Sequence, residues 1–295
     1  MTNDVKVVAA AQRYIKEHHC EDDFCADKVC ENVGYSRRQL DRFFHKHLHI
    51  SLSDYLRAVV LSESARELAA TDKAVIDIAL ESHYQSHSGF TRSFSKLFSV
   101  TPDEYRKSMI AIPIFTQYPI NHYYILKEGK TVEQTAICTV TAIDRPKRKL
   151  IYLTSESADG YMSYCEEVGC EWEGLLNSIP EKFETAALIE LPDFLVEEGI
   201  SRTASGVEVP EDYCKPLPEG YRQAELPPCT MLFFESEPFE NPEDFGEYIG
   251  QVFAAIEKYD LRRHGYELAR EDAPSYNFGA SHEIGARAAI PVRKI

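Results

Sequence analysis

Basic side chains recur at matching positions in the first third of the sequence. A shift of 50 residues superimposes Arg42 on Arg92 and Lys46 on Lys96. Guanidinium and ammonium groups neutralise phosphate oxygens, and arginine can also donate two hydrogen bonds to guanine. Two copies of this chemistry in one chain indicate two surfaces that contact a nucleic-acid duplex.

Apolar residues follow the same repeat and define the elements that must position these basic groups. The shift of 50 pairs Leu40 with Phe90, Phe44 with Phe94 and Tyr55 with Tyr105, and upstream a shift of 49 pairs Val29 with Ile78 and Tyr35 with Tyr84. The second copy therefore has one extra residue in its turn. Each copy has the pattern of a short helix, a turn and a longer helix, which is the plan of a helix-turn-helix. The apolar spacing within Leu52–Ala70 predicts a connecting helix of about five turns.

Polar side chains should occupy the outward face of each longer helix, since the apolar ones point into the core. On a single surface helix such residues are usually no more than solvated, but their repetition here favours contact with DNA. The candidate DNA-contacting residues are Arg37, Arg38, Gln39, Arg42 and Lys46 in the first copy, and His87, Ser88, Arg92 and Lys96 in the second.

These motifs resemble AraC/XylS-type transcription regulators. Residues 77–106 contain an Ile-Ala helix, Gly-Phe ahead of the second longer helix, a Phe-x-x-x-Phe pair and Thr-Pro-x-x-Tyr-Arg, and residues 34–47 match the family's first unit. The resemblance implies a DNA-binding domain over residues 1–110, whose two recognition helices enter successive major-groove turns about 34 Å apart. His83 and Ser99 stand where the family commonly has glycine, so His83 is expected to need a strained or altered backbone.

The net charge of −16, taken over the whole chain, argues against binding to nucleic acid. The charge is uneven, however. Residues 1–112 hold 15 Lys and Arg against 16 Asp and Glu, together with seven of the ten His, whereas residues 113–295 hold 17 against 32. The first part is nearly neutral and the second is strongly acidic, so the total does not exclude a DNA reader in the first part.

Strand-like runs replace the helical pattern after Pro113 and Pro119. We therefore expect a linker at residues 111–125 and a second domain at 126–295. Strands are predicted at 133–143, 150–154, 185–191, 203–209, 221–226, 230–235 and 286–292, and helices at 157–179 and 241–263. The expected fold class is multi-domain: an all-α double helix-turn-helix domain, then an α+β domain with two similar halves.

The second domain resembles the gyrase inhibitor-like effector-binding domain of the Rob/BmrR type. The features that carry the resemblance are Trp172, the strand after Pro227, Gly-Tyr-Glu at 265–267 and Ala-Ile-Pro-Val at 289–292. It implies a cleft that holds small, often aromatic and cationic, molecules between aromatic rings and a buried carboxylate. The candidate ligand-binding residues are Tyr161, Tyr164, Trp172, Phe234, Tyr266, Tyr276, Asn277 and Glu283.

Two features weigh against a simple cation site. Each aromatic residue of this set has the alternative of a place in the core. Asn277 stands where the family often has the ligand carboxylate, and a neutral amide cannot balance a cation. A cationic specificity would therefore need Glu283 or another acid.

The sequence thus predicts a DNA-binding transcription regulator, not an enzyme, whose second domain binds a small-molecule effector. The first alternative is a small-molecule hydrolase that uses Tyr276 and Glu283, and the second is an architectural protein without a ligand. The expected partners are double-stranded DNA and an aromatic or cationic effector, and RNA polymerase is a candidate protein partner.

Neither a cofactor nor a metal site is expected, because the eight cysteines lack CxxC spacing. No apolar run reaches the roughly 18 residues of a membrane span. Met1–Ala11 lacks the basic and apolar regions of a signal peptide. We therefore expect a cytoplasmic protein with no membrane partner.

Overall fold

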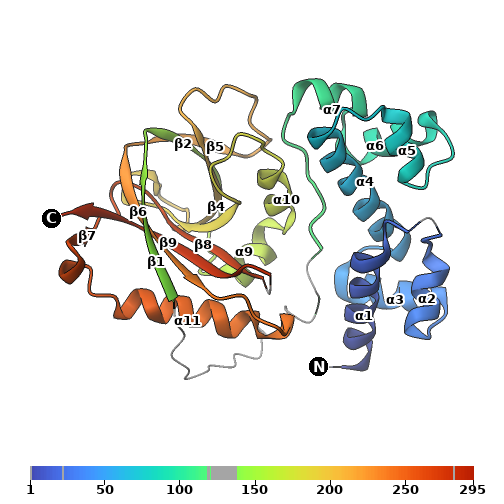
Figure 1. Cartoon of the computed structure of the whole chain (residues 1–295), viewed down its shortest axis with the longest axis horizontal. Coiled ribbons are helices and arrows are strands. Elements are labelled where there is room, and N and C mark those ends of the chain that lie inside the picture. Colours follow the sequence, from blue (N-terminus) through green and yellow to red (C-terminus); the bar gives the residue numbers. More distant parts are fainter. Residues whose placement is uncertain (1, 22, 118–119, 121–137, 282) are drawn as a thin grey trace. The chain divides into compact units, whose positions relative to one another are not determined.

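The internal repeat of the sequence becomes a repeat of helices in the computed structural model, which describes residues 2–21, 23–117, 120, 138–281 and 283–295 (Figure 1). The chain divides into two compact units, Met1–Tyr124 and Ile125–Ile295. The helices of the first unit are α1 (Asn3–His18), α2 (Ala26–Val33), α3 (Arg37–Leu48), α4 (Leu52–Ala70), α5 (Val75–Glu81), α6 (His87–Phe98) and α7 (Pro102–Ser108). No helix in the described part of the chain is long and apolar enough to cross a membrane.

Helix α4 is shared by two hydrophobic cores. Its first half contributes Leu52, Tyr55 and Val59 to a core with α1, α2 and α3. Its second half contributes Leu61, Ala65 and Leu68 to a core with α5, α6 and α7. The predicted connecting helix therefore has the expected bounds, and at about 1.5 Å per residue its length of 19 residues sets the separation of the two helix-turn-helix units.

The two turns between the helices differ in the residue that takes a left-handed backbone. Gly34 has φ +71° in the first helix-turn-helix, and His83 has φ +64° at the equivalent place in the second helix-turn-helix. A residue other than glycine is destabilised by roughly 1–2 kcal/mol in this left-handed region. The positive φ of His83 confirms the altered backbone that the sequence predicted there. The imidazole Nε2 of His83 lies 3.0 Å from the carbonyl oxygen of His19, so its side chain joins this turn to the end of α1.

A proline removes a hydrogen bond between the second helix-turn-helix and the helix that follows it, α7. In the first helix-turn-helix, Asp41 Oδ1 accepts a hydrogen bond of 2.9 Å from the backbone N–H of Leu52. The equivalents of these two residues are Thr91 and Pro102, and proline has no N–H. The buried Oγ1 of Thr91 accordingly has no hydrogen-bond partner in the described part of the chain.

The segment after α7 packs against the first unit. Ile112 and Ile114 are buried in the second core and Ile120 in the first. The backbone N–H of Phe115 donates to Ser62 Oγ at 2.8 Å, and that of Ile120 donates to Gln12 Oε1 at 2.8 Å. The described part of the expected 111–125 linker is thus part of the helical unit, whereas residues 118–119 and 121–125 lie outside the described residues.

The second unit contains an antiparallel sheet with the strand order β1-β6-β9-β8-β3-β4-β2-β5, and β7 pairs with β9. The strands are β1 (Cys138–Arg145), β2 (Arg148–Thr154), β3 (Ala187–Glu190), β4 (Thr203–Pro210), β5 (Arg222–Leu226), β6 (Cys229–Ser236), β7 (Tyr266–Leu268), β8 (Ser275–Ser281) and β9 (Gly285–Lys294). The helices are α9 (Tyr161–Val168), α10 (Glu171–Asn177) and α11 (Phe245–Lys258). Short 3-10 turns at Asp193–Leu195, Pro242–Asp244 and Arg262–His264 complete the described elements.

Glycine and asparagine explain two of the differences from the expected elements. The single helix predicted at 157–179 is two helices, because Gly169 has φ +92° between them. The helix predicted at 241–263 is limited to α11. The pattern missed β7 and also β8, whose residues Asn277 and Gly279 are uncommon in strands. The first predicted strand, 133–143, begins outside the described residues, and its described part belongs to β1.

Two short turns show that the sheet is strongly curved. β1 is at one end of the strand order and β2 is next to the other end, yet only Pro146 and Lys147 separate them. In the same way, only Pro227 and Pro228 separate β5 from β6. Connections this short require the two ends of the sheet to meet, which produces a concave inner face.

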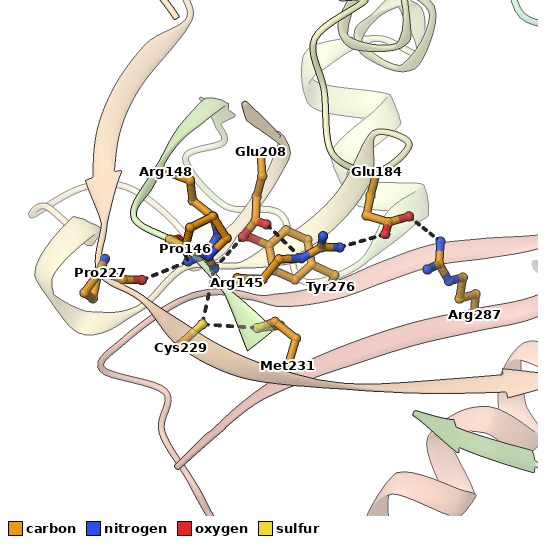
Figure 2. Close-up of polar contacts among 10 residues, drawn as sticks. All are labelled: Arg145, Pro146, Arg148, Glu184, Glu208, Pro227, Cys229, Met231, Tyr276 and Arg287. Carbon is orange, nitrogen blue, oxygen red and sulfur yellow. Dashed lines mark hydrogen bonds and ion pairs between the residues drawn. The ribbon is translucent and has the colours of Figure 1, made fainter. Parts of the chain in front are cut away.

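Arg148 fastens the two turns to each other. Its Nη1 donates to the carbonyl oxygens of Pro227 at 2.8 Å and Pro146 at 3.4 Å, and its Nη2 lies 2.7 Å from Glu208 Oε1 on β4 (Figure 2). The Arg148 side chain is fully buried and that of Glu208 is 5% exposed. A buried charge needs such a partner, since an isolated one is strongly destabilising.

Replacing Arg148 with methionine should therefore destabilise the second unit. We expect Arg148→Met to lower its free energy of unfolding by about 3–5 kcal/mol, because the Glu208 carboxylate is left buried and uncompensated. Adding Glu208→Gln to this variant should restore much of the loss. The fluorescence of Trp172, the single tryptophan of the chain, measures urea unfolding of this unit.

Lys147→Met is the matched control, because Lys147 makes exposed ion pairs with Glu211 and Glu225. Its effect should stay below about 1 kcal/mol. Equal effects of the two single substitutions would contradict the role assigned to Arg148.

Candidate functional site

The second helix of each helix-turn-helix unit presents polar side chains to solvent. On α3 the exposed residues include Arg37, Arg38, Gln39, Arg42 and Lys46, and on α6 they include His87, Ser88, Arg92 and Lys96. Their apolar neighbours Leu40, Phe44, Phe90 and Phe94 are fully buried. The structure therefore places every sequence-predicted DNA-contacting residue on an outer helix face.

Several of the α3 residues already have partners within the protein. Arg37 Nη2 donates to Ser53 Oγ at 3.1 Å. Gln39 Oε1 accepts from the backbone N–H of Ser36 at 3.2 Å and completes a capping box at the start of the helix. These bonds fix the beginning of α3, so Gln39 serves first as a helix cap, which its polarity alone did not reveal.

Lys46 and Lys96 occupy equivalent positions but differ in their surroundings. Lys46 Nζ lies 2.5 Å from Asp4 Oδ2 on α1, and His47 Nε2 lies 3.0 Å from the same oxygen. The hydrogen bond from Lys46 holds the pKa of the Asp4 carboxyl well below its usual range. Within the described residues Arg38, Arg92 and Lys96 make no ion pair, and their charges remain available to an anion.

A cleft opens on the concave face of the sheet in the second unit. The cavity at its centre measures about 10 Å³, which is room for about one water molecule. Its lining residues are Arg145, Glu184, Thr185, Val207, Glu208, Met231, Phe233, Tyr276 and Phe278. Aromatic rings and charged groups from four strands and one loop thus converge on a space that is filled by the protein's own side chains.

Glu208 is the buried carboxylate of this cleft. The hydroxyl of Tyr276 donates to Glu208 Oε1 at 2.6 Å, and Arg148 approaches the same oxygen at 2.7 Å (Figure 2). Burial raises the pKa of the Tyr276 hydroxyl well above its ordinary value. Tyr276 therefore acts as a hydrogen-bond donor to a charge that Arg148 already balances.

Two further arginines lie over the aromatic floor of the cleft. The guanidinium carbon of Arg287 is 4.6 Å from the ring centre of Phe233 and 5.0 Å from that of Phe278, and that of Arg145 is 5.4 Å from Phe233. Glu184 bridges both arginines, at 2.7 Å from Arg145 Nη2 and 2.6 Å from Arg287 Nη1. Although burial opposes it, hydrogen bonds from Arg287 and Arg145 hold the pKa of the Glu184 carboxyl below its usual range.

The sequence-predicted ligand residues fall in separate places. Tyr276 lines the cleft, and Asn277 accepts a hydrogen bond from the backbone N–H of Gly279 at 2.9 Å. The Tyr164 hydroxyl donates to the Leu153 carbonyl at 2.7 Å. The remaining members are Tyr161 on α9, Trp172 on α10 with its ring 6.0 Å from that of Tyr164, Tyr266 on β7, Phe234 on β6 and the exposed Glu283.

Strand alternation corrects the prediction for Phe234. Its side chain is fully buried in the core beneath α11, whereas its neighbour Phe233 lines the cleft, because successive side chains of a strand point to opposite faces. The predictions also missed Glu208, Arg145, Glu184 and Arg287. Glu208 lies in a strand that is buried on both faces, and a charged residue in so apolar a run is the signal that could have revealed it.

The alternative of a hydrolase built on Tyr276 and Glu283 gains no support from this geometry. The Tyr276 hydroxyl is engaged by Glu208, and its raised pKa makes it a poor nucleophile or base. Among the described residues no group of three or more His, Cys, Asp or Glu side chains could hold a metal ion.

Comparisons with known proteins match the helical unit. A helix-turn-helix domain family matches residues 29–108. The Multiple antibiotic resistance protein MarA of Escherichia coli (strain K12) is 31% identical over 107 residues, which cover 36% of this chain and 84% of MarA. The Transposon Tn10 TetD protein of Escherichia coli is 35% identical over 94 residues, which cover 32% of this chain and 68% of TetD.

For one longer relative, the match covers about a third of each chain. The Transcriptional regulator Rob of Salmonella typhimurium (strain LT2) is 39% identical over 92 residues, which cover 31% of this chain and 32% of Rob. Among solved structures, the EcmrR C-terminal domain aligns over 54% of this chain and 99% of its own length, with a TM-score of 0.34 and 13% identity. A likeness at this level identifies nothing by itself.

The carboxyl group of Glu173 on α10 should make the stability of the second unit depend on pH. Burial raises the pKa of Glu173 from about 4.5 to about 7. The folded state therefore favours the protonated carboxyl, and stability that is present below pH 4.5 is lost as the pH rises to about 7. We expect Glu173→Gln to leave stability unchanged near pH 4 and to raise it by up to about 3 kcal/mol at pH 8.

Urea unfolding at several pH values measures this difference. Glu171→Gln is the control, because Glu171 lies on the same helix and is exposed. A Glu173→Gln profile that runs parallel to the unsubstituted one would disprove the burial of a proton at this site.

Proposed function

Because the chain belongs to the AraC-type family of DNA-binding transcription regulators, we propose that α3 and α6 are its recognition helices and that they enter successive major grooves of one duplex. The observation that carries this proposal is that α3 and α6 each expose basic side chains and that both helices pack against the same helix, α4. The length of α4 is about 28 Å at 1.5 Å per residue, comparable to one turn of DNA at about 34 Å.

The two recognition helices contribute unequally to binding in this proposal. Arg92 and Lys96 on α6 make no ion pair among the described residues, and each phosphate that they neutralise releases counterions. On α3, Arg42 is the equivalent of Arg92 and Arg38 also makes no ion pair among the described residues, while Lys46, the equivalent of Lys96, is neutralised by Asp4. The nearly neutral charge of residues 1–112 keeps non-specific attraction low, so affinity depends on these few side chains.

We propose in addition that the second unit is a gyrase inhibitor-like domain that binds a small-molecule effector in the cleft around Glu208. The supporting observations are the convergent aromatic rings and the buried, hydrogen-bonded carboxylate. The strand order supports two similar halves: β2-β4-β3 with α9 and α10, and β6-β9-β8 with α11, meet at the pair β3 and β8. Titration with diverse compounds, followed by Trp172 fluorescence and product analysis, tests this function, since saturable binding without turnover supports a sensor.

DNA binding should respond differently to substitutions at equivalent lysines. We expect Lys96→Ala to weaken binding to a selected duplex and to lower the slope of log affinity against log salt by about one. Lys46→Ala should have a smaller effect, because Asp4 already neutralises this charge. Asp4→Asn should release Lys46 and strengthen binding. Fluorescence anisotropy at several salt concentrations gives both quantities.

Arg42→Ala and Arg92→Ala extend the test to both recognition helices and should each weaken binding. Lys73→Ala is the control of equal charge, because Lys73 is paired with Glu67 and Glu81. If Arg42, Arg92 and Lys96 can all be replaced without any change in affinity or salt slope, α3 and α6 are not the DNA-contacting elements.

A further inference from the structure

We propose that the cleft of the second unit takes a planar aromatic anion, whose acidic group replaces the Glu184 carboxylate between Arg145 and Arg287. This inference rests on the proposed function, in which the second unit binds a small molecule in this cleft. It names the chemical class of that molecule from the charges and rings that surround the cavity.

The buried carboxylate of the cleft is not available to a ligand cation. Glu208 has Arg148 at 2.7 Å and the Tyr276 hydroxyl at 2.6 Å. Arg148 is fully buried and also donates to the Pro227 carbonyl at 2.8 Å, so it cannot move aside without unfastening the turn between β5 and β6. A cation would therefore meet a carboxylate whose charge is already balanced.

The other two arginines share a less firmly held carboxylate, although Arg287 Nε also lies 2.5 Å from Glu235 Oε1 on β6. Glu184 lies in the segment between α10 and β3, outside any helix or strand, and its side chain is 22% exposed. Figure 2 shows its carboxylate reaching Arg145 with one oxygen and Arg287 with the other. Arg145 Nε is buried and donates no hydrogen bond within the described residues, and Glu208 Oε2 is 3.8 Å away from it.

Aromatic rings line the space next to these guanidinium groups. Phe233 and Phe278 are stacked, with ring centres 6.0 Å apart and planes 19° apart, and Tyr276 stacks on Phe278 at 5.7 Å. Flat surfaces of this kind favour a flat ligand ring. The cavity holds little more than one water molecule, so a ligand must displace a side chain, and Glu184 is the lining carboxylate without a fixed position in the sheet.

Charge balance favours an anion over a cation. A ligand carboxylate that replaces Glu184 leaves the sum of charges in the cleft unchanged, and its two oxygens can accept from two guanidinium groups. A cation that displaced Glu184 would instead add a positive charge where Arg145 has lost its closest carboxylate and Arg287 keeps only Glu235, and these like charges repel.

Calorimetric titration of the full chain with three naphthalene probes tests this inference. The probes are 2-naphthoate, the neutral 2-naphthamide and the cationic 2-naphthyltrimethylammonium. We expect naphthoate to bind best, and Glu184→Gln to tighten its binding by about tenfold, because the competing internal carboxylate is removed. Arg287→Gln should abolish naphthoate binding. Glu197→Gln is the control of equal charge, because Glu197 makes an exposed pair with Arg222.

Circular dichroism and thermal unfolding identify any variant that fails to fold. A neutral or cationic probe that binds better than naphthoate, with Glu184→Gln giving no gain for the anion, would overturn the ligand class and leave effector binding intact. If none of the three probes binds to the unsubstituted chain or to Glu184→Gln, the ligand class is contradicted, whereas effector binding by the second unit is decided separately by the titration with diverse compounds.

Discussion

The buried ion pair between Arg148 and Glu208 is the constraint on which the second unit depends. Curvature brings the two ends of the sheet together at two proline-containing turns, and Arg148 bonds to a carbonyl oxygen in each of them. Neither charge could remain in this position alone, because burial of an unpaired ion costs several kcal/mol. The same pair also fixes the centre of the cleft, because Glu208 accepts a hydrogen bond from Tyr276 and its negative charge is balanced by Arg148.

Arginine serves two opposite purposes in the two units. In the helical unit, Arg38 and Arg92 are exposed and have no carboxylate partner among the described residues, so their charges face outward. In the second unit, Arg145 and Arg287 are largely buried, lie over Phe233 and share the Glu184 carboxylate, and Arg287 also pairs with Glu235. The overall charge of −16 describes neither environment, because field strength near a site is set by neighbours within a Debye length of about 10 Å.

The elements that repeat were the ones that the sequence could predict. The helices around Arg42 and Arg92 follow from apolar spacing that occurs twice, and α4 has the predicted bounds. The cleft was harder to foresee, because its residues come from β1, β4, β6, β8 and β9 and from a loop, and they meet only when the sheet curves. Aromatic content could not separate Phe233 from Phe234, since a strand with two buried faces carries no polar alternation to tell its sides apart.

The described residues after α7 are hydrogen-bonded to α4, the helix that separates α3 from α6. Phe115 is bonded to Ser62 in the middle of α4. Ile120 is bonded to Gln12, whose amide Nε2 in turn donates to the Tyr55 hydroxyl on α4 at 3.1 Å. Any displacement of this segment must break these hydrogen bonds and expose Ile112 and Ile114 to water. Residues 111–117 therefore stabilise the helical unit by packing against α4. A displacement of these residues would also change the packing around α4.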